Sequence, residues 1–194
     1  MLDALNGGTP SSIIGYASLH SAFSLTGANE LTGGGYGRQA VTWSLAAGGS
    51  KASASLAGAF SVPASSTVAF TGLWSALTAG IFTTMSPNDG GTLYAFTAAS
   101  AAPGVLTAPG SSYASGQSVI VLPGAGATLP AGLSEGTIYY VADVSADTFS
   151  LSATSGGSAI TTTAAGAGIV QSVTLETFGA AGTFDVTEET LALF

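Results

Sequence analysis

The sequence predicts an all-β protein: a β-sandwich of jelly-roll-like type that carries a small inserted β-module. Three observations predict this class. Short runs of apolar, β-branched and aromatic residues recur along the 194 residues, clusters of Gly, Ser and Pro separate these runs, and several runs alternate between apolar and polar side chains. Many short strands at such spacing are typical of sandwiches and barrels.

Each expected strand is one such run. In residues 36–45, Gln39, Val41 and Trp43 share one face, because successive side chains of a strand point to opposite sides. A short helix is expected only at residues 1–5. The expected strands, in chain order, are residues 13–20, 36–45, 67–74, 81–85, 92–96, 118–122, 137–144, 148–152, 169–178, 183–187 and 190–194.

Two changes in composition indicate how the chain is divided. Residues 98–109 are crowded with Ala, Pro and Gly, and residues 161–168 are almost entirely Thr, Ala and Gly. The stretch between them is self-contained, with a tight turn at 129–133 followed by a hairpin. The expected division is a discontinuous sandwich domain, residues 1–96 and 172–194, and an inserted module, residues 97–171.

Composition excludes several classes of protein. Charged residues make up 6% of the chain and hydrophobic residues 46%, which is the reverse of a disordered chain. The ten acids give a formal charge of −8, and Arg38 and Lys51 are the only Lys or Arg side chains. A nucleic-acid partner is therefore not expected, because it requires a basic face. With no cysteine, disulfides and thiolate metal sites are excluded.

The uncharged stretches do not predict a membrane span. Residues 52–88 and 90–134 lack charge but are interrupted by Gly, Ser, Thr and Pro, whereas a spanning helix needs about 20 predominantly apolar residues. Residues 1–8 show neither a basic nor an apolar region of the kind that a signal peptide has. We expect synthesis in a cytoplasm without export.

The residue types that carry out catalysis do not form a motif here. His20 is the only histidine, and no Gly-x-Ser-x-Gly sequence accompanies it. We expect a locally hydrogen-bonded imidazole at the end of a strand. Glu188 and Glu189 are adjacent and would point to opposite faces of a strand, while Asp143 and Asp147 flank an expected turn. No catalytic, cofactor-binding or metal-binding residue is predicted.

Two further groups of residues have structural interpretations. The glycines of residues 33–37 lack the Lys-Ser/Thr that a phosphate-binding loop requires, so a turn is expected. Arg38, which follows them, is expected to pair with a carboxylate of the chain or of a neighbour. Of the adjacent Tyr139 and Tyr140, one is expected to face inward and the other outward, and the outward one is the candidate surface contact.

Several ordered segments resemble one family, the small bacteriophage tail fibre or minor tail proteins. They include Gly15-Tyr16-Ala17-Ser18-Leu19-His20, Thr26-Gly27-Ala28-Asn29-Glu30, Gly33 to Trp43, Gly72-Leu73-Trp74-Ser75-Ala76 and Glu176 to Phe184. The stretch from Leu129 to Ser152 resembles a module that recurs in phage tail and fibre proteins. The family often has an acidic-Pro turn after the Leu-His pair, where this chain has Ser21-Ala22-Phe23-Ser24-Leu25.

The resemblance implies a non-enzymatic structural protein of the virion, with other virion proteins and copies of itself as partners. Two alternatives stay open: a decoration protein that clamps capsomers on the head, and a module that binds host-surface glycan through Tyr139 or Tyr140. A glycan-cleaving enzyme is the last alternative.

Overall fold

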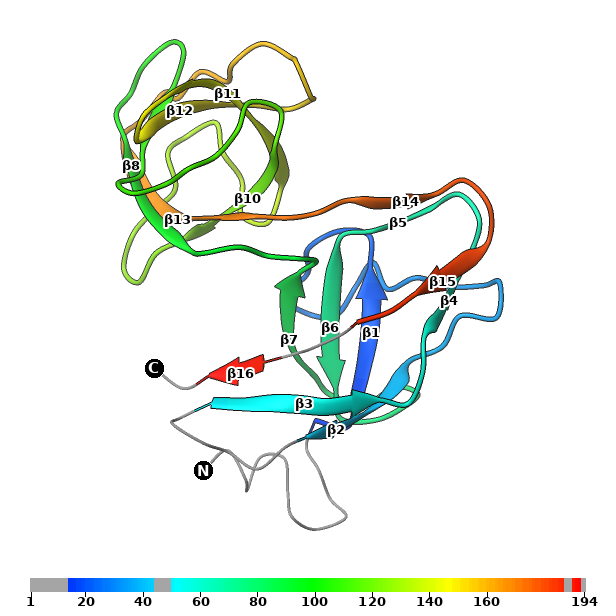
Figure 1. Ribbon diagram of the computed structural model, residues 1–194. Helices are drawn as coiled ribbons and strands as arrows, with labels where there is room; N and C mark the ends of the chain where they lie inside the picture. Colours follow the sequence, from blue (N-terminus) through cyan, green and yellow to red (C-terminus); the bar gives the residue numbers. More distant parts are fainter. Residues whose placement is uncertain (1–13, 44–49, 187–189, 193–194) are drawn as a thin grey trace. The chain divides into compact units, whose positions relative to one another are not determined.

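The computed structural model describes residues 14–43, 50–186 and 190–192 (Figure 1). The described residues form strands, turns and loops, and no helix is found among them. The strands pair in antiparallel sheets of the sandwich type, which confirms the all-β prediction. None of the described segments is a helix that could cross a membrane. The helix expected at residues 1–5 lies outside the described residues.

The chain divides into two compact units. Unit 1 comprises Met1–Ser86 and Glu176–Phe194, and unit 2 comprises Pro87–Leu175. Unit 2 therefore begins earlier and ends later than the module expected at residues 97–171. The reason is that the strand Tyr94–Ala98 pairs with Gly166–Ser172, so that residues before 97 belong with the inserted unit.

Unit 1 is built on one open sheet and two short ribbons. The sheet has the order β16-β3-β2-β1-β6-β7, and the ribbons pair β14 with β5 and β15 with β4. The strands are β1 (Tyr16–His20), β2 (Gln39–Trp43), β3 (Ser50–Leu56), β4 (Phe60–Val62), β5 (Ser66–Val68), β6 (Phe70–Trp74), β7 (Phe82–Pro87), β14 (Glu176–Phe178), β15 (Gly182–Phe184) and β16 (Thr190–Ala192).

Unit 2 is a closed antiparallel barrel with the order β10-β11-β12-β9-β8-β13. Closure leaves no unpaired edge strand. The hairpin expected around residues 146–147 is present, because Ser145 pairs with Thr148. The strands are β8 (Tyr94–Ala98), β9 (Val105–Thr107), β10 (Ser118–Pro123), β11 (Ile138–Ser145), β12 (Thr148–Ser152) and β13 (Gly166–Ser172).

Two of the expected strands are each divided in the structure. Residues 67–74 form β5 and β6, which are separated at Ala69, whose N–H donates to the carbonyl of His20 at 2.9 Å. Residues 169–178 contain the end of β13 and the whole of β14, which belong to different units. Strands β3, β4 and β9 were not among the expected strands. The Ser and Ala residues of β3 carry little β-propensity, and β4 and β9 have three residues each, too few to show an alternation.

Each unit has its own apolar core. In unit 1, Leu19, Phe60 and Leu73 are buried between the sheet and the ribbons, and in unit 2, Phe149 and Leu151 are buried inside the barrel. Full burial of one such side chain contributes about 1.5–3 kcal/mol. Strand β1 also buries its other face, on which Ser18 and His20 lie. That second face carries the polar cluster described next.

Candidate functional site

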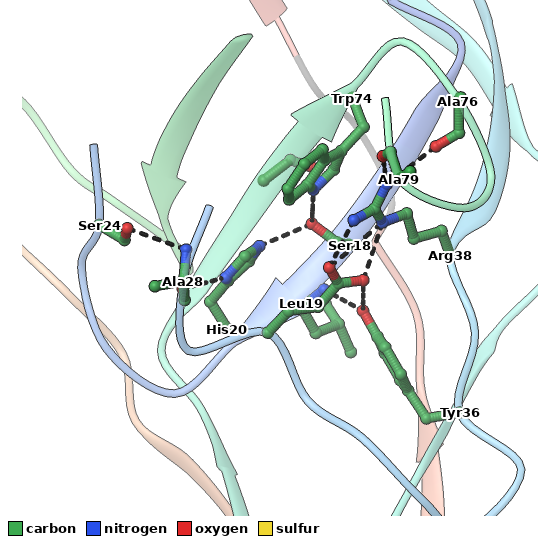
Figure 2. Close-up of polar contacts among 12 residues, drawn as sticks. Ser18, Leu19, His20, Ser24, Ala28, Tyr36, Arg38, Trp74, Ala76 and Ala79 are labelled. Atoms are coloured by element: carbon green, nitrogen blue, oxygen red, sulfur yellow. Dashed lines mark hydrogen bonds and ion pairs between the residues drawn. The ribbon is translucent and has the colours of Figure 1, made fainter. Parts of the chain in front are cut away.

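The largest group of interacting polar side chains in the described part of the chain lies in unit 1, over β1 and β6 (Figure 2). We call it the polar network, and define it as Ser18, His20, Glu30, Tyr36, Arg38 and Trp74. Strand β1 supplies Ser18 and His20, and β6 supplies Trp74. Glu30, Tyr36 and Arg38 come from the loops between β1 and β2.

His20 is hydrogen-bonded through both ring nitrogens and is fully buried. Its Nδ1 lies 2.9 Å from the carbonyl oxygen of Ala28, which can only accept, so Nδ1 carries the proton. Its Nε2 then accepts from the hydroxyl of Ser18 at 2.7 Å. Burial lowers the pKa of His20 from 6.5, against the smaller opposing effects of the Ala28 carbonyl and the Glu30 carboxylate. The imidazole is therefore neutral at pH 7.

Ser18 joins His20 to Trp74. The Trp74 indole N–H donates to Ser18 Oγ at 2.8 Å, and the hydroxyl lies 3.2 Å from the carbonyl oxygen of Gly72. A glycine is needed at position 72, because a Cβ there would lie 2.5 Å from His20 Nε2 and 2.7 Å from Ser18 Oγ. The small residues of β1 and β6 thus leave room for the imidazole and the hydroxyl.

Arg38 makes the ion pair that the sequence predicts, and its partner is Glu30. Nη2 lies 2.8 Å from Glu30 Oε2, and Nε donates to Oε1 at 2.9 Å. The guanidinium also lies over the Trp74 ring, with Cζ 3.5 Å from the ring centroid. Nη1 donates to the carbonyl oxygens of Ala76 and Ala79, at 2.9 and 2.7 Å. One side chain, from the residue before β2, therefore bonds both Glu30 and the loop between β6 and β7.

Tyr36 links the polar network to the apolar core of unit 1. Its hydroxyl accepts the N–H of Leu19 at 2.8 Å and donates to Glu30 Oε1 at 3.3 Å, while its ring stacks on Phe60. Burial raises the pKa of Tyr36 well above its usual value, so the phenol stays protonated. The turn expected at the preceding glycines is present, because the Tyr36 N–H donates to Gly33 O at 2.9 Å.

The geometry of the network suits a fold-stabilising role. Ser18 and His20 have a relative exposure of 0%, so the Ser–His pair offers no open face to a substrate. The local hydrogen bonding expected for His20 is present. Ser18 is a local partner, because it lies two residues before His20 on the same face of β1. The contacts of Trp74 with Ser18 and of Glu30 with Arg38 were not expected, because no local pattern indicates which distant residues the fold brings together.

The other residues considered from the sequence belong to unit 2 or lie outside the described residues. Tyr139 is 5% exposed and its hydroxyl accepts the N–H of Ser134 at 2.9 Å, whereas Tyr140 is partly exposed. The outward-facing tyrosine is therefore Tyr140. Asp147 lies in the turn between β11 and β12, but its carboxylate accepts the N–H of Gly110, which is 37 residues away, at 3.0 Å. Asp143 lies in β11 with a φ of 49°. Glu188 and Glu189 lie outside the described residues.

Among the residues that the structure describes, no three His, Cys, Asp or Glu side chains are placed to hold a metal ion. Comparisons of the chain with protein-family models, curated proteins and solved structures give no match.

Proposed function

We propose that this chain is a non-enzymatic structural protein of a bacteriophage particle, of the tail fibre or minor tail type, that acts by forming interfaces with copies of itself and with other particle proteins. The observation that carries the proposal is the chemistry of its surface. Large aliphatic side chains are exposed on a chain of which only 6% is charged. They are Leu25, Leu77, Ile81, Leu93, Val105 and Val144.

Such a surface is suited to protein contacts. Exposed apolar patches rimmed by polar residues commonly mark interaction sites, and an interface with few charges loses little free energy to desolvation. Arg38 is not available to an outside ligand, because its guanidinium is bonded to Glu30 and to two backbone carbonyls. His20 and Arg38 are thus both bonded within the fold.

The polar network gives the family resemblance a physical meaning. The segments that resemble tail fibre and minor tail proteins contain Ser18, His20, Glu30, Arg38 and Trp74, and these five residues meet in the structure. We propose that this buried network is the physical reason why these segments carry the resemblance. The proposed role in a phage particle rests on this resemblance.

The test is to locate the chain in purified particles of the phage that encodes it. Mass spectrometry of the particles measures its copy number, and immunogold labelling shows its position. We expect label on the tail. Label on the capsid faces would instead favour a head decoration protein, and absence of the chain from washed particles would contradict a structural role.

A further inference from the structure

The hydroxyl of Ser18 lies at the centre of the polar network and has three neighbours within hydrogen-bond distance. Figure 2 shows Ser18 between His20 and Trp74, with Oγ 2.7 Å from His20 Nε2 and 2.8 Å from the indole nitrogen of Trp74. The third neighbour is the carbonyl oxygen of Gly72, at 3.2 Å. A serine hydroxyl donates one hydrogen bond and accepts two. Which neighbour receives the hydroxyl proton therefore depends on the protonation state of His20.

When the imidazole is neutral, the hydroxyl donates to His20. The carbonyl of Ala28 fixes the ring proton on Nδ1, so Nε2 is an acceptor. Ser18 then donates to Nε2 and accepts the indole N–H of Trp74, which can only donate. In this state one lone pair of Ser18 Oγ is unused, and the carbonyl of Gly72 receives no hydrogen bond from Ser18.

When the imidazole is charged, the bond between Ser18 and His20 reverses. Both ring nitrogens of a charged imidazole donate, so Nδ1 keeps its bond to Ala28 and the new Nε2–H points at Ser18 Oγ. Ser18 accepts it on the unused lone pair and keeps the bond from Trp74. Its own proton then turns to the carbonyl of Gly72. Every donor has an acceptor again, and only one hydroxyl proton has changed its direction.

The groups around His20 act on its charge in opposite directions. The Glu30 carboxylate favours the charged imidazole and the Arg38 guanidinium opposes it, and these two form one ion pair. Tyr36, which bonds Glu30, is a protonated phenol. The other titratable residue of β1 is Tyr16, four residues away, and β6, β7 and the loop of residues 21–29 contain none.

Burial has the largest effect on His20 and lowers its pKa, so the second ring proton binds only in acid. A hydroxyl that could not turn would then set two donors against each other, the Ser18 O–H and the His20 Nε2–H, and the network would have to open. The carbonyl of Gly72 gives the hydroxyl proton another acceptor. The loss of stability in acid is thereby limited to the burial of one charge, without the loss of a hydrogen bond.

We propose that Ser18 is a hydrogen-bond switch. Its hydroxyl donates to His20 when the imidazole is neutral and to the carbonyl of Gly72 when the imidazole is charged. Unit 1 thus takes up one proton in acid while the polar network stays intact. This inference does not depend on the proposed particle function, and its tests need only the purified chain.

The first test follows the imidazole by NMR. His20 is the one histidine of the chain, so labelling histidine with ¹⁵N gives the ring signals of a single residue. The full chain is titrated from about pH 8 to about pH 4, the range around the ordinary histidine pKa. We expect Nδ1 to be protonated throughout and Nε2 to gain its proton in acid, while the amide signals of unit 1 keep their folded positions. Protonation of Nε2 only together with unfolding of unit 1 would overturn the proposal.

The second test reads the two other neighbours of Ser18 in the same titration. The carbonyl ¹³C signal of Gly72 should move downfield as His20 is protonated, because this carbonyl accepts a new hydrogen bond. The carbonyl of Ala28 is the internal control and should move less, because it accepts from His20 in both states. The protection of the Trp74 indole N–H from exchange should be unchanged in acid. A Gly72 signal that moves no more than that of Ala28, or a loss of protection at Trp74, would mean that the network opens instead.

The third test removes the hydroxyl. In Ser18→Ala the charged imidazole has no acceptor at Nε2, so the proton affinity of His20 should fall about tenfold, since hydrogen bonds to a charged group are the stronger ones. A hydroxyl that only donates to the neutral ring predicts the opposite, because its removal would make the neutral ring less stable and raise the affinity.

Ser21→Ala is the matched control, because Ser21 follows His20 directly and its Oγ bonds the carbonyl of Asn29 instead of the imidazole. It should leave the proton affinity of His20 unchanged. Circular dichroism melting confirms that both variants are folded, and the Gly72 measurement on the unmodified chain decides the proposal if Ser18→Ala is not. A raised affinity in Ser18→Ala, or an equal fall in Ser21→Ala, would overturn the switch.

Discussion

Strands β1 and β12 are both buried on their two faces. They differ in how the polar side chains on one of these faces are hydrogen-bonded, and this difference shows which interactions stabilise the interior of each unit. In β1, Ala17 and Leu19 enter the apolar core, while Ser18 and His20 point to the opposite face. In β12, Phe149 and Leu151 enter the barrel core, while Ser150 and Ser152 point to the opposite face.

The polar faces of the two strands are satisfied to different extents. Ser18 bonds His20 and accepts from Trp74, so every polar atom there has a partner. On β12, Ser152 Oγ donates to the carbonyl oxygen of Thr154 at 2.8 Å and lies 3.2 Å from that of Tyr140, but Ser150 Oγ has no hydrogen-bond partner among the described residues. Unit 1 thus depends on a polar network as well as on its core, whereas unit 2 depends on barrel closure and apolar packing.

The largest expected effects come from the apolar faces. Phe149→Ala should lower the free energy of unfolding by about 4 kcal/mol and Leu19→Ala by about 3 kcal/mol, because each leaves a cavity. Hydrogen exchange measured peptide by peptide should show faster exchange in unit 2 for Phe149→Ala and in unit 1 for Leu19→Ala. Equal acceleration of both units by either variant would contradict two separate cores.

Removing the ion pair should affect unit 1 nearly as much. Arg38→Met loses the bonds to Glu30 and to two carbonyls and leaves a partly buried carboxylate, which we expect to cost about 3 kcal/mol. Urea denaturation of Arg38→Met, Glu30→Gln and the double variant gives the coupling energy, expected to be about 1 kcal/mol or more. Additive single effects would mean that the pair contributes nothing beyond its parts.

Substituting one serine on the polar face of each strand compares the contributions of the two faces to stability. Ser18→Ala leaves the Trp74 N–H and His20 Nε2 without their partner and should lower stability by about 2 kcal/mol. Ser150→Ala removes an unpaired hydroxyl and should raise stability by about 1 kcal/mol. Ser152→Ala, on the same face of β12, loses bonds and serves as the control. Thermal melting of the three variants measures these changes in stability. A loss of stability in Ser150→Ala as large as that in Ser152→Ala would contradict the prediction that the Ser150 hydroxyl is unpaired.

The smallest expected effect is a dependence of stability on pH. Since burial lowers the pKa of His20, the unfolded chain binds a proton more readily than the folded one. With respect to this group, the free energy of unfolding should be constant about one pH unit or more above 6.5. It should fall progressively as the pH drops through 6.5, with a slope of at most about 1.4 kcal/mol per pH unit. Urea denaturation between pH 7.5 and 5.5 measures the slope. His20→Gln, which removes the one histidine, should have a smaller slope, and an unchanged slope would assign the effect to other groups.

Local patterns of the sequence predicted much of the strand content. The alternation in residues 137–152 indicated a hairpin with one tyrosine inward, and β11, β12 and Tyr139 agree with this. Local patterns did not show β3, whose Ser and Ala residues form a strand because neighbouring strands supply the hydrogen bonds. They also did not show that the run 67–74 divides at Ala69, since β5 pairs with β14, more than a hundred residues away.

The sequence by itself determined the all-β class, the turn at residues 33–36 and the need of Arg38 for a carboxylate, because backbone alternation, glycine and unpaired charge act over a few residues. Tertiary structure alone decided that the carboxylate is Glu30, that the Trp74 indole N–H donates to Ser18 beside His20, and that the strands of unit 2 close into a barrel whereas the sheet of unit 1 does not close. Those outcomes depend on which distant segments come together, and that depends on the packing of the whole unit.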